Sequence, residues 1–474
     1  MGTLQAAFRN LNSLDACPPL EQAVVEFIQG FTSDSMNPEV RIAVSRLVRD
    51  QVAVQIGSSR LPWSRKILSF TTARRVPGTS SVIANDVKMS AVDAAFVNAT
   101  FGHGFEYDDA HRASASHPGC CVIPAALALG EELNATLDEV VAAIVVGYEV
   151  YTRIGCMAAP DLLKRGFHPH AVLSTFGAAA VASKLRNFNA ETTLNALAIA
   201  LSHASGTGEF TSTGGSVKRV HSGIGTKNGM LSAEMAQAGI TGPRAFLSGK
   251  KGFFKTFLQR DAGVEPERWF GLGQEFQITK VWLKPYCCCG CIHAYIDVCR
   301  RYGGRVDDIA TVTLKIQRSA NVVVGTVNAN VYMPKNIEHV QFSLPIQMAF
   351  ALLGLGNGYQ VHLDYLEGKV NMDAVVKVAS LITIIETPEL DEAYPGKFVA
   401  DVTVNFKNGT LERVFVEDSL GTIQNPIPEL DHDAKFMELT SGVLGSERAT
   451  ALLAALRTLR GSMPVAELTE MLTV

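Results

Sequence analysis

The chain of 474 residues lacks the sequence features that mark nucleic-acid-binding, secreted and membrane proteins. Its 42 Lys and Arg residues are outnumbered by 46 Asp and Glu residues, which gives a net charge of -4 at pH 7, whereas phosphate backbones are bound by clustered cations. Residues 1–9 contain no basic stretch followed by an apolar run, so no secretory signal is expected. The most apolar stretches, such as residues 140–146, are far shorter than the roughly 20 residues of a membrane helix. We therefore expect a cytoplasmic protein without nucleic-acid or membrane partners.

The chain also has no recognisable cofactor or metal motif. The glycine-flanked run 214–223 lacks the Gly-Lys-Ser/Thr ending of a phosphate-binding loop, and no Gly-x-Gly-x-x-Gly follows a convincing strand. Four of the nine cysteines lie in the run 284–293, but three of these four are consecutive and a second Cys-x-x-Cys pair is missing. We interpret them as buried thiols of a protein in a reducing compartment, and we expect neither a cofactor nor a metal ion.

The composition indicates a folded protein with a large core. Hydrophobic residues make up 47% of the chain and charged residues 19%, which argues against intrinsic disorder. The first 270 residues have mostly helical patterns. Asn37 is expected to be an N-cap, with Pro38 at the first helical position, and the apolar residues that follow repeat every three or four positions. Further helices are expected over residues 137–151, 171–185 and 193–203.

The pattern changes near residue 277. Alternating or β-branched runs predict strands over residues 278–283, 309–316, 398–406 and 411–416, the last two joined by a hairpin-like turn at 407–409. Helices are expected at residues 344–355 and 372–382, and again after Pro426, where Ala449, Leu452, Leu453 and Leu456 share a face. The sequence therefore predicts a mainly α protein, with a helical part formed by residues 1–279 and 416–474 and an inserted α+β region at residues 280–415.

Polar residues gather in four runs beside glycines and prolines, which mark loops. The first run, 106–111 followed by His117, is rich in carboxylates and imidazoles. It fits a metal site, a general-base site, a helix N-terminus that carries carboxylates, or a solvated loop that caps the next helix. The second run, 166–170, places His168 before a long Ala-rich helix, where an imidazole can meet an anion bound by free backbone N–H groups. A structural or exposed histidine is the alternative.

The third run, 214–223, carries Lys218, Arg219 and His221 between glycines. Such a turn lets the backbone approach a carboxylate or phosphate closely, although an exposed basic turn has the same pattern. The fourth run is the cysteine-rich segment that begins at Lys284. Together the runs supply histidines, lysines and carboxylates. This inventory suits proton abstraction beside a carboxylate, where a base and preorganised positive charge must stabilise the developing enolate.

These residues, in their order along the chain, resemble the MmgE/PrpD family, which includes 2-methylcitrate dehydratase, cis-aconitate decarboxylase and iminodisuccinate epimerase. The resemblance covers nearly the whole chain. Its carriers are Gly102, His103, residues 106–111, 117–119, 124–126 and 147–150, Arg153, residues 166–169, Lys218, His221, Gly223, Gly242, Pro243, Gly252, Phe253, residues 284–286, Cys288, Phe342, Ser343 and Pro345. So many matches in one order are specific to a family.

The resemblance implies a homodimer in which each subunit has a large helical domain formed by both chain ends, an inserted α+β lid domain and an active site in the cleft between them. By resemblance, the catalytic residues that line this site are Asp108, His117, His168 and Lys218. The residues expected to bind the substrate are Glu106, His221, Lys284, Cys289 and Tyr332, of which Lys284 and Cys289 belong to the lid segment.

Four residues depart from the family pattern. Glu106 stands where the family usually has Asp, Ala110 replaces Thr, His170 replaces a small polar residue, and Cys287 replaces proline. Glu106 reaches about one methylene further than Asp, and Ala110 lacks a hydroxyl donor. Because a site that loses a polar partner prefers a different substrate, these departures bear on the substrate rather than on the class of reaction.

The residues and the resemblance predict a cofactor-independent lyase that acts on a small polycarboxylate of the 2-methylcitrate or cis-aconitate class. His168 or His117 would exchange a proton, while Lys218 and Lys284 hold substrate carboxylates. Loss of water, as in a dehydratase, is favoured over loss of carbon dioxide, as in a decarboxylase. The alternatives are an epimerase of the iminodisuccinate type that uses the same residues, and a non-catalytic carboxylate-binding protein.

Overall fold

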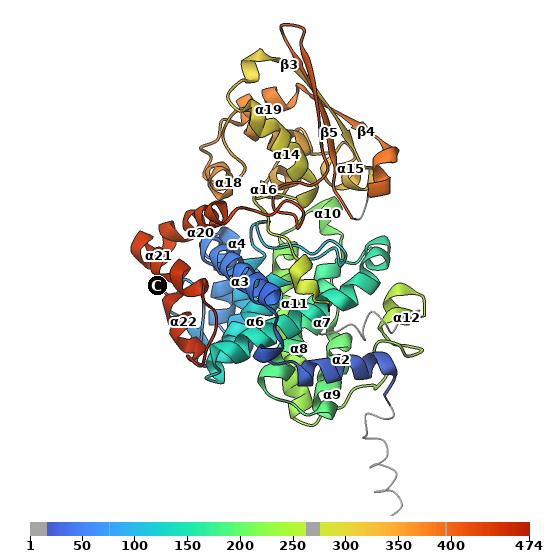
Figure 1. The fold of residues 1–474 in the computed structure, drawn as a ribbon, viewed down its shortest axis with the longest axis vertical. Helices are drawn as coiled ribbons and strands as arrows, with labels where there is room; N and C mark the ends of the chain where they lie inside the picture. The colour runs from blue at the N-terminus through green and yellow to red at the C-terminus, as the bar shows by residue number, and fades with distance from the viewer. Residues whose placement is uncertain (1–16, 75, 262–274, 394–395) are drawn as a thin grey trace, which may run out of the picture.

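The computed structural model describes residues 17–74, 76–261, 275–393 and 396–474, and it has two lobes. A helical body, at the bottom of Figure 1, is built from both ends of the chain, and a smaller lobe with a sheet lies above it. Within the body, helix α3 (Pro38–Ser58) packs against helix α20 (Glu429–Leu444). The fold is therefore mainly α, as the sequence predicts. Residues 1–9, for which no secretory signal is expected, lie outside the described residues.

Helix α3 begins where the sequence places its cap. The side-chain oxygen of Asn37 accepts the backbone N–H of Val40 at 2.9 Å, and Pro38 occupies the first helical position. Along the helix, the apolar residues Val40, Val44, Leu47 and Val48 are buried in one stripe. A cap of this kind stabilises a helix by about 1 kcal/mol, so local signals alone are enough to set this boundary.

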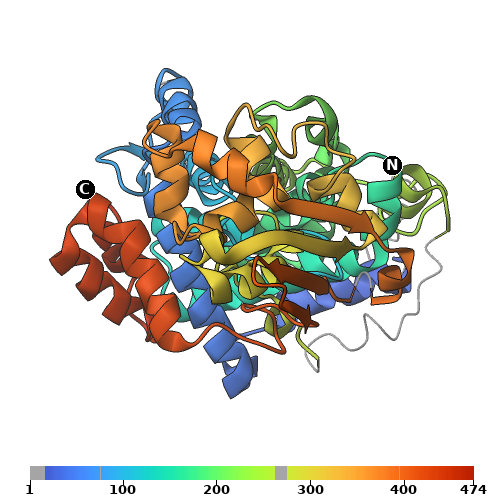
Figure 2. The ribbon, with the colours of Figure 1, turned by 90° about the horizontal axis from the view of Figure 1, so that it is seen from above.

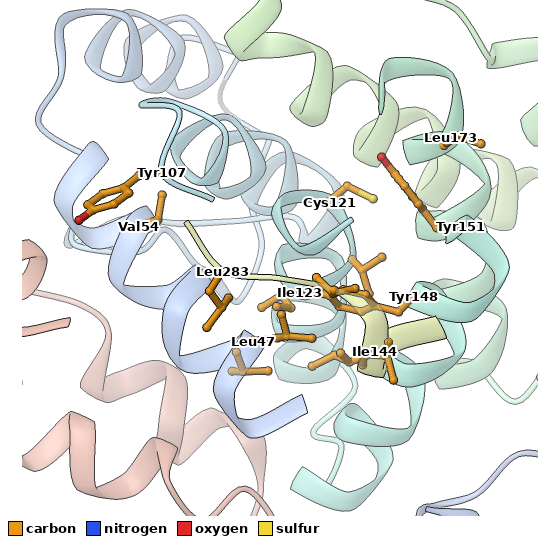
Figure 3. Close-up of a cluster of buried hydrophobic side chains, with 14 of the residues drawn as sticks. Leu47, Val54, Tyr107, Cys121, Ile123, Ile144, Tyr148, Tyr151, Leu173 and Leu283 are labelled. Atoms are coloured by element: carbon orange, nitrogen blue, oxygen red, sulfur yellow. The ribbon is translucent and has the colours of Figure 1, made fainter. Parts of the chain in front are cut away.

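The core of the helical body contains the 28-residue helix α7 (Leu137–Lys164), which extends well beyond the predicted residues 137–151. By length and composition this helix could cross a membrane, but 94% of its most apolar window is buried inside the protein. Figure 3 shows Tyr148 of α7 beside Ile123 of helix α6 (Gly119–Glu132). Helix α7 therefore forms part of the protein interior.

Helix α8 (Pro169–Leu185) packs against both α7 and helix α11 (Val217–Gln237). Two glycines of α11 make the second contact unusually close. A Cβ at Gly225 would lie 2.4 Å from the Cβ of Ser174, and a Cβ at Gly229 would lie 2.3 Å from the carbonyl oxygen of Thr175. The start of α11 is thereby held directly beside the start of α8.

The third polar run is not the extended turn that its glycines predict. Only Gly214 and Gly215, with φ values of 83° and 116°, form a turn. Helix α11 begins at Val217, so that Lys218 and His221 lie in its first turns and project from a rigid element. The helix prevails over the turn signal because α11 packs along α8 and helix α5 (Ala91–Gly102).

The upper lobe contains a four-stranded mixed sheet, which Figure 2 shows from above. Its order is β4-β3-β5-β6, made of β4 (Ile382–Glu386), β3 (Ile309–Ile316), β5 (Ala400–Phe406) and β6 (Leu411–Val416). The β3–β4 pair is parallel and the other two pairs are antiparallel. The hairpin between β5 and β6 turns at Gly409, whose φ is 87°, as predicted. The sheet coincides with the expected α+β insertion, whose limits at residues 280 and 415 stay a prediction.

One predicted strand is wrong. Residues Gln277–Lys280 form the 3-10 helix η3, and Trp282 makes only an isolated bridge to Ala110. The cause is a contact distant in sequence: the buried carboxylate of Glu149 on α7 accepts the backbone N–H of Ile278 at 2.9 Å. A donor that a strand ladder would need is therefore used by a side chain.

The helix expected over residues 372–382 is too long. Helix α19 (Met372–Ala379) ends earlier, and strand β4, which the sequence pattern did not reveal, begins at Ile382 and pairs with β3 from Val312 onward. The β-branched residues of β4 fit this position beside a parallel neighbour. Pairing between distant segments thus decides the conformation here.

Candidate active site

The four polar runs of the sequence come together in the structure. His103 is the C-cap of α5, and the segment 104–118 leads from it into α6. His168 immediately precedes α8, and Lys218 lies in the first turn of α11. Lys284 reaches the same place from the inserted region and contacts Glu106. The cluster therefore combines residues from the helical part and from the insertion.

His103 and Asp108 form a fully buried pair. The Nδ1 of His103 lies 2.7 Å from Oδ2 of Asp108, and both side chains have no exposed surface. Burial, with the nearby Lys218 charge, holds the pKa of His103 well below its usual value, so the ring is neutral near pH 7. In this arrangement Nδ1–H donates to the carboxylate, and the lone pair of His103 is on Nε2.

His117 has a backbone carbonyl as the partner of its Nδ1, where His103 has a carboxylate. Its Nδ1–H donates to the backbone carbonyl of Asp109 at 2.6 Å, which leaves the Nε2 lone pair for a proton or a ligand. The side chain is 18% exposed, and its Nδ1 is 3.7 Å from Oδ2 of Asp108. Burial lowers the pKa of His117, and the Asp108 charge partly opposes this effect. Among the histidines of the cluster, His117 therefore combines a fixed tautomer with access to solvent.

His168 and His221 form a second imidazole pair. Their Nδ1 atoms lie 2.9 Å apart, so one ring donates and the other accepts. Burial holds the pKa of His168 well below its usual value and lowers that of His221 to about 4. A cavity of about 100 Å³ lies beside His221 and is also lined by Gly206 and Val217. This pair is neutral near pH 7 and borders open space.

Two lysines converge on one carboxylate. Glu106 pairs with Lys218 through Oε1 and with Lys284 through Oε2, the latter at 3.2 Å. Lys284 also lies 3.3 Å from the carbonyl oxygen of Glu106 and 3.9 Å from Asp108 Oδ1. Burial and the Lys284 charge lower the pKa of Lys218, whereas its direct ion pair with Glu106 favours the ammonium form. The backbone of Glu106 has a φ of 56°, a left-handed conformation that costs a non-glycine residue about 1 kcal/mol or more.

Cations and amides from distant segments hold the loop that carries these carboxylates. Arg219 donates to the carbonyl of Gly104, and the Gln341 side chain donates to the carbonyl of Phe105 at 2.8 Å. The ammonium group of Lys435, from α20, donates to the carbonyls of Tyr107 at 2.9 Å and Lys284 at 3.0 Å. Arg219 therefore orders the backbone, although the sequence placed it among possible anion ligands.

The carboxylate of Asp109 caps helix α6. It accepts the hydroxyl of Tyr148 at 2.7 Å and the backbone N–H of Gly119 at 3.1 Å. A Cβ at Gly119 would lie 2.7 Å from the same carboxylate, so glycine permits this approach. Burial raises the pKa of Asp109 to about 7. One of the interpretations of the first polar run, a helix N-terminus that carries a carboxylate, is therefore correct for Asp109.

The last two expected substrate ligands differ in position. A hydrogen bond from Cys291 and the charges of Lys284 and Lys218 lower the pKa of the Cys289 thiol to about 7, and its contact with a substrate stays a prediction. Tyr332 is half-buried, and its hydroxyl donates to the carbonyl of Ile382 in β4 at 2.9 Å. Its contact with a substrate stays a prediction.

Three further residues beside the site, His103, Cys120 and His170, were not predicted as site residues. His170 Nδ1 lies 2.7 Å from the Tyr151 hydroxyl, and its Nε2 lies 3.6 Å from Sγ of Cys120. The rings of His170 and His103 are 4.5 Å apart. One ligand atom from each of His103, Cys120 and His170 lies within 4.8 Å of the other two, a group that could hold a metal ion. In the sequence, His103 is one of the carriers of the family resemblance and His170 departs from the family pattern, but no pattern there brings either of them together with Cys120.

The MmgE/PrpD N-terminal domain pattern matches residues 22–264, and the MmgE/PrpD C-terminal domain pattern matches residues 286–460. A cis-aconitate decarboxylase of Aspergillus terreus is 26% identical over 442 residues, which cover 90% of each chain. The cis-aconitate decarboxylase-like protein oryM of Aspergillus oryzae is 28% identical over 449 residues, or 89% of this chain and 90% of that protein. The cis-aconitate decarboxylase of Homo sapiens is 35% identical over 187 residues, 38% of each chain.

Proposed function

The chain belongs to the MmgE/PrpD family, and we propose that it is a decarboxylase that acts on an unsaturated polycarboxylate of the cis-aconitate class. At the coarser level its relatives support a lyase-type role. The family resemblance favours loss of water, because a dehydratase is the commoner activity under this family pattern. Three relatives that align over about 90% of their length have names that contain cis-aconitate decarboxylase, and this supports loss of carbon dioxide instead.

The observation that carries this proposal is the carboxylate of Glu106 between two ammonium groups. Lys218 pairs with one of its oxygens and Lys284 with the other, at 3.2 Å. Two cations in this arrangement can bind a carboxylate, and a substrate carboxylate can displace or join that of Glu106. Nearby imidazoles with free Nε2 atoms supply the groups that a proton transfer needs.

The chemistry of such an acid fits these groups. A carboxymethyl group is attached to a carbon–carbon double bond. The bond between its methylene carbon and its carboxylate breaks, carbon dioxide leaves, and the electron pair forms a new double bond. The pair of the old double bond moves to the far carbon, which lies next to another carboxylate, and that carbon takes up one proton. Lys218 and Lys284 stabilise the negative charge that develops on this carboxylate.

We assign the proton to His117. Its Nδ1–H is fixed on the carbonyl of Asp109, so a proton delivered to substrate comes from Nε2. Substrate carboxylates beside the ring favour the imidazolium form and oppose the effect of burial on its pKa. His168, hydrogen-bonded to His221, is the competing group. We further propose that the protein acts as a homodimer, which light scattering of the purified protein tests.

Substrate profiling by NMR in D2O tests the proposed function. The purified protein is incubated separately with cis-aconitate, citrate, 2-methylcitrate and iminodisuccinate. We expect cis-aconitate or a close analogue to release carbon dioxide. One deuterium should be incorporated at the far carbon of the old double bond, which becomes the saturated methylene carbon beside a carboxylate. The Lys218→Ala variant is the control for contaminating activity.

Other outcomes are equally distinct. Loss of water from citrate or 2-methylcitrate would establish a dehydratase, and deuterium exchange without loss of any group would establish an epimerase. If none of the four acids reacts but one stabilises the protein against heat, a carboxylate-binding role replaces the enzymatic one.

A further inference from the structure

We propose that His103, His170 and Cys120 form a binding site for a zinc-class divalent cation, and that the bound ion inhibits the enzyme. One ligand atom of each residue lies within 4.8 Å of the other two, and all three side chains are buried. The Cys120 sulfur is 3.6 Å from Nε2 of His170. Two ligands of one tetrahedral zinc ion have about this separation, because Zn–S and Zn–N bonds are about 2.3 Å and 2.0 Å long.

Both imidazoles are held in the way that metal-binding histidines usually are. His103 Nδ1 lies 2.7 Å from a carboxylate oxygen of Asp108, and His170 Nδ1 lies 2.7 Å from the hydroxyl of Tyr151. Histidine ligands commonly use one ring nitrogen for a carboxylate or another polar partner and the other for the metal. In both rings the Nδ1 contact leaves Nε2 for the ion.

His103 provides a second and independent indication of a ligand. Its Nε2 is buried and makes no hydrogen bond to any part of the chain that the structure describes. A buried nitrogen without a partner costs free energy, and such groups are rare in folded proteins. Cys120 lies in the first turn of α6, and its thiol donates to the carbonyl of His117 at 3.2 Å. Burial raises the pKa of this thiol, so it gives up its proton only when a cation binds the sulfur. The bound cation would also give Nε2 of His103 the partner that it lacks.

The ligand types indicate which cations fit. Two imidazoles and one thiolate suit zinc, cobalt or copper, whereas magnesium and calcium prefer oxygen ligands. Three protein ligands leave a fourth position open. The imidazole of His117 could fill this fourth position, because its ring centroid lies 5.2 Å from that of His103 and 5.8 Å from that of His170.

The inhibitory role rests on the proposed function. An ion held by His103 and His170 would take its fourth ligand from His117 or from a substrate carboxylate. The first choice removes the imidazole that delivers the proton, and the second draws the substrate away from Lys218 and Lys284. Either choice slows the reaction, so the metal-free enzyme is the active form.

Cobalt(II) binding tests the site without any substrate. Chelator-treated, dialysed protein should bind one equivalent of Co²⁺ and show a near-ultraviolet thiolate-to-cobalt charge-transfer band with intense visible bands of a four-coordinate ion. Cys120→Ala should abolish the charge-transfer band, and His170→Gln should weaken binding by more than roughly tenfold. Cys121→Ala is the matched control, because that buried thiol contacts the carbonyl of Ser174 and should leave the band intact.

Turnover measurements test the inhibition. Zn²⁺ should slow the wild-type reaction, a chelator should restore it, and Cys120→Ala should keep its basal rate while losing sensitivity to Zn²⁺. The site is overturned if the wild type shows no charge-transfer band or if Cys120→Ala retains it. Binding without inhibition overturns the inhibitory role. If no acid is turned over, the proposed function fails, while the cobalt spectrum still decides whether the metal site exists.

Discussion

The ammonium group of Lys284 lies 3.2 Å from the carboxylate of Glu106, and both side chains are buried. The protein therefore holds an internal carboxylate in contact with a cation that is proposed to bind substrate. A polycarboxylate that enters the site must compete with Glu106 or share its cations. If Lys284 binds the substrate as proposed, the length of the Glu106 side chain is one determinant of which acids bind.

The variant Glu106→Gln tests this competition. Removal of one partner from a buried ion pair costs about 3 kcal/mol or more, so the melting temperature of the free protein should fall. Added succinate should then raise the melting temperature of Glu106→Gln more than that of the wild type, since its carboxylates can take the vacated cations. Equal stabilisation of the two proteins would show that Glu106 does not stand in for a ligand.

Lys218→Ala should lower kcat/KM by at least about a hundredfold, because a charge-assisted contact to a carboxylate in a buried site contributes roughly 3 kcal/mol. Steady-state kinetics with the substrate found by NMR measure the effect. Lys227→Ala is the matched control on the same helix, where the ammonium group pairs with Asp93 at 2.6 Å. A folded Lys218→Ala enzyme with a near-normal rate would remove Lys218 from the substrate site.

His117→Gln should lose roughly 10²–10⁴-fold in turnover, which is the usual contribution of a positioned proton-transfer group. Its melting temperature should change little, because within the described residues the ring makes one backbone hydrogen bond and a longer contact to Asp108, and its side chain is 18% exposed. His168→Gln is measured in parallel and should have the smaller effect on kcat. If His168→Gln instead proves the more damaging substitution, His168 is the proton-transfer residue.

Acid should destabilise the fold partly through His111. This ring is 2% exposed and contacts Ser114, and burial lowers its pKa from 6.5 to about 4. Because the folded-state pKa is depressed, the stabilising contribution is complete above pH 6.5 and is lost as the pH falls from 6.5 towards about 4. Between neutral pH and about pH 5 the loss amounts to roughly 2 kcal/mol.

Urea unfolding of the wild type and of His111→Asn, at both pH values, measures this contribution. The variant lacks the titrating ring, so its free energy of unfolding should depend less steeply on pH, whatever its absolute stability. Parallel pH dependences of the two proteins would mean that His111 titrates alike in the folded and unfolded chains.

The elements that the sequence predicts well are those set by neighbouring residues. Asn37 caps α3 through a hydrogen bond to Val40 three residues away. Strands β3 and β6 have the predicted limits: β3 alternates buried with less buried residues, whereas β6 lies at the edge of the sheet without a buried residue and follows the predicted turn at Gly409. The strand predicted over residues 278–283 is wrong, because the backbone conformation there depends on the carboxylate of Glu149, more than a hundred residues earlier.

In the candidate site too, contacts between residues close in sequence could be predicted, and contacts that depend on the packing of distant helices could not. The His103–Asp108 pair spans five residues, and its members lie in or beside the recognised motif. The contact between His170 and Cys120 instead requires α6, α7 and α8 to pack tightly. Gly147 permits this, since a Cβ there would lie 2.6 Å from Val181 and 2.7 Å from Val122. Periodicity within a single helix carries no information on such three-helix contacts.

The position of Lys435 has a consequence for the order in which the protein matures during synthesis. Its ammonium group, near the C-terminal end of the chain, holds the carbonyls of both Tyr107 and Lys284. While the ribosome is still making the last segment, the histidines, lysines and carboxylates of the site already exist, but the cation that ties their two loops together does not. The two loops therefore gain this connection only after helix α20 has emerged and docked against α3, which puts the completion of the candidate site in the final part of translation.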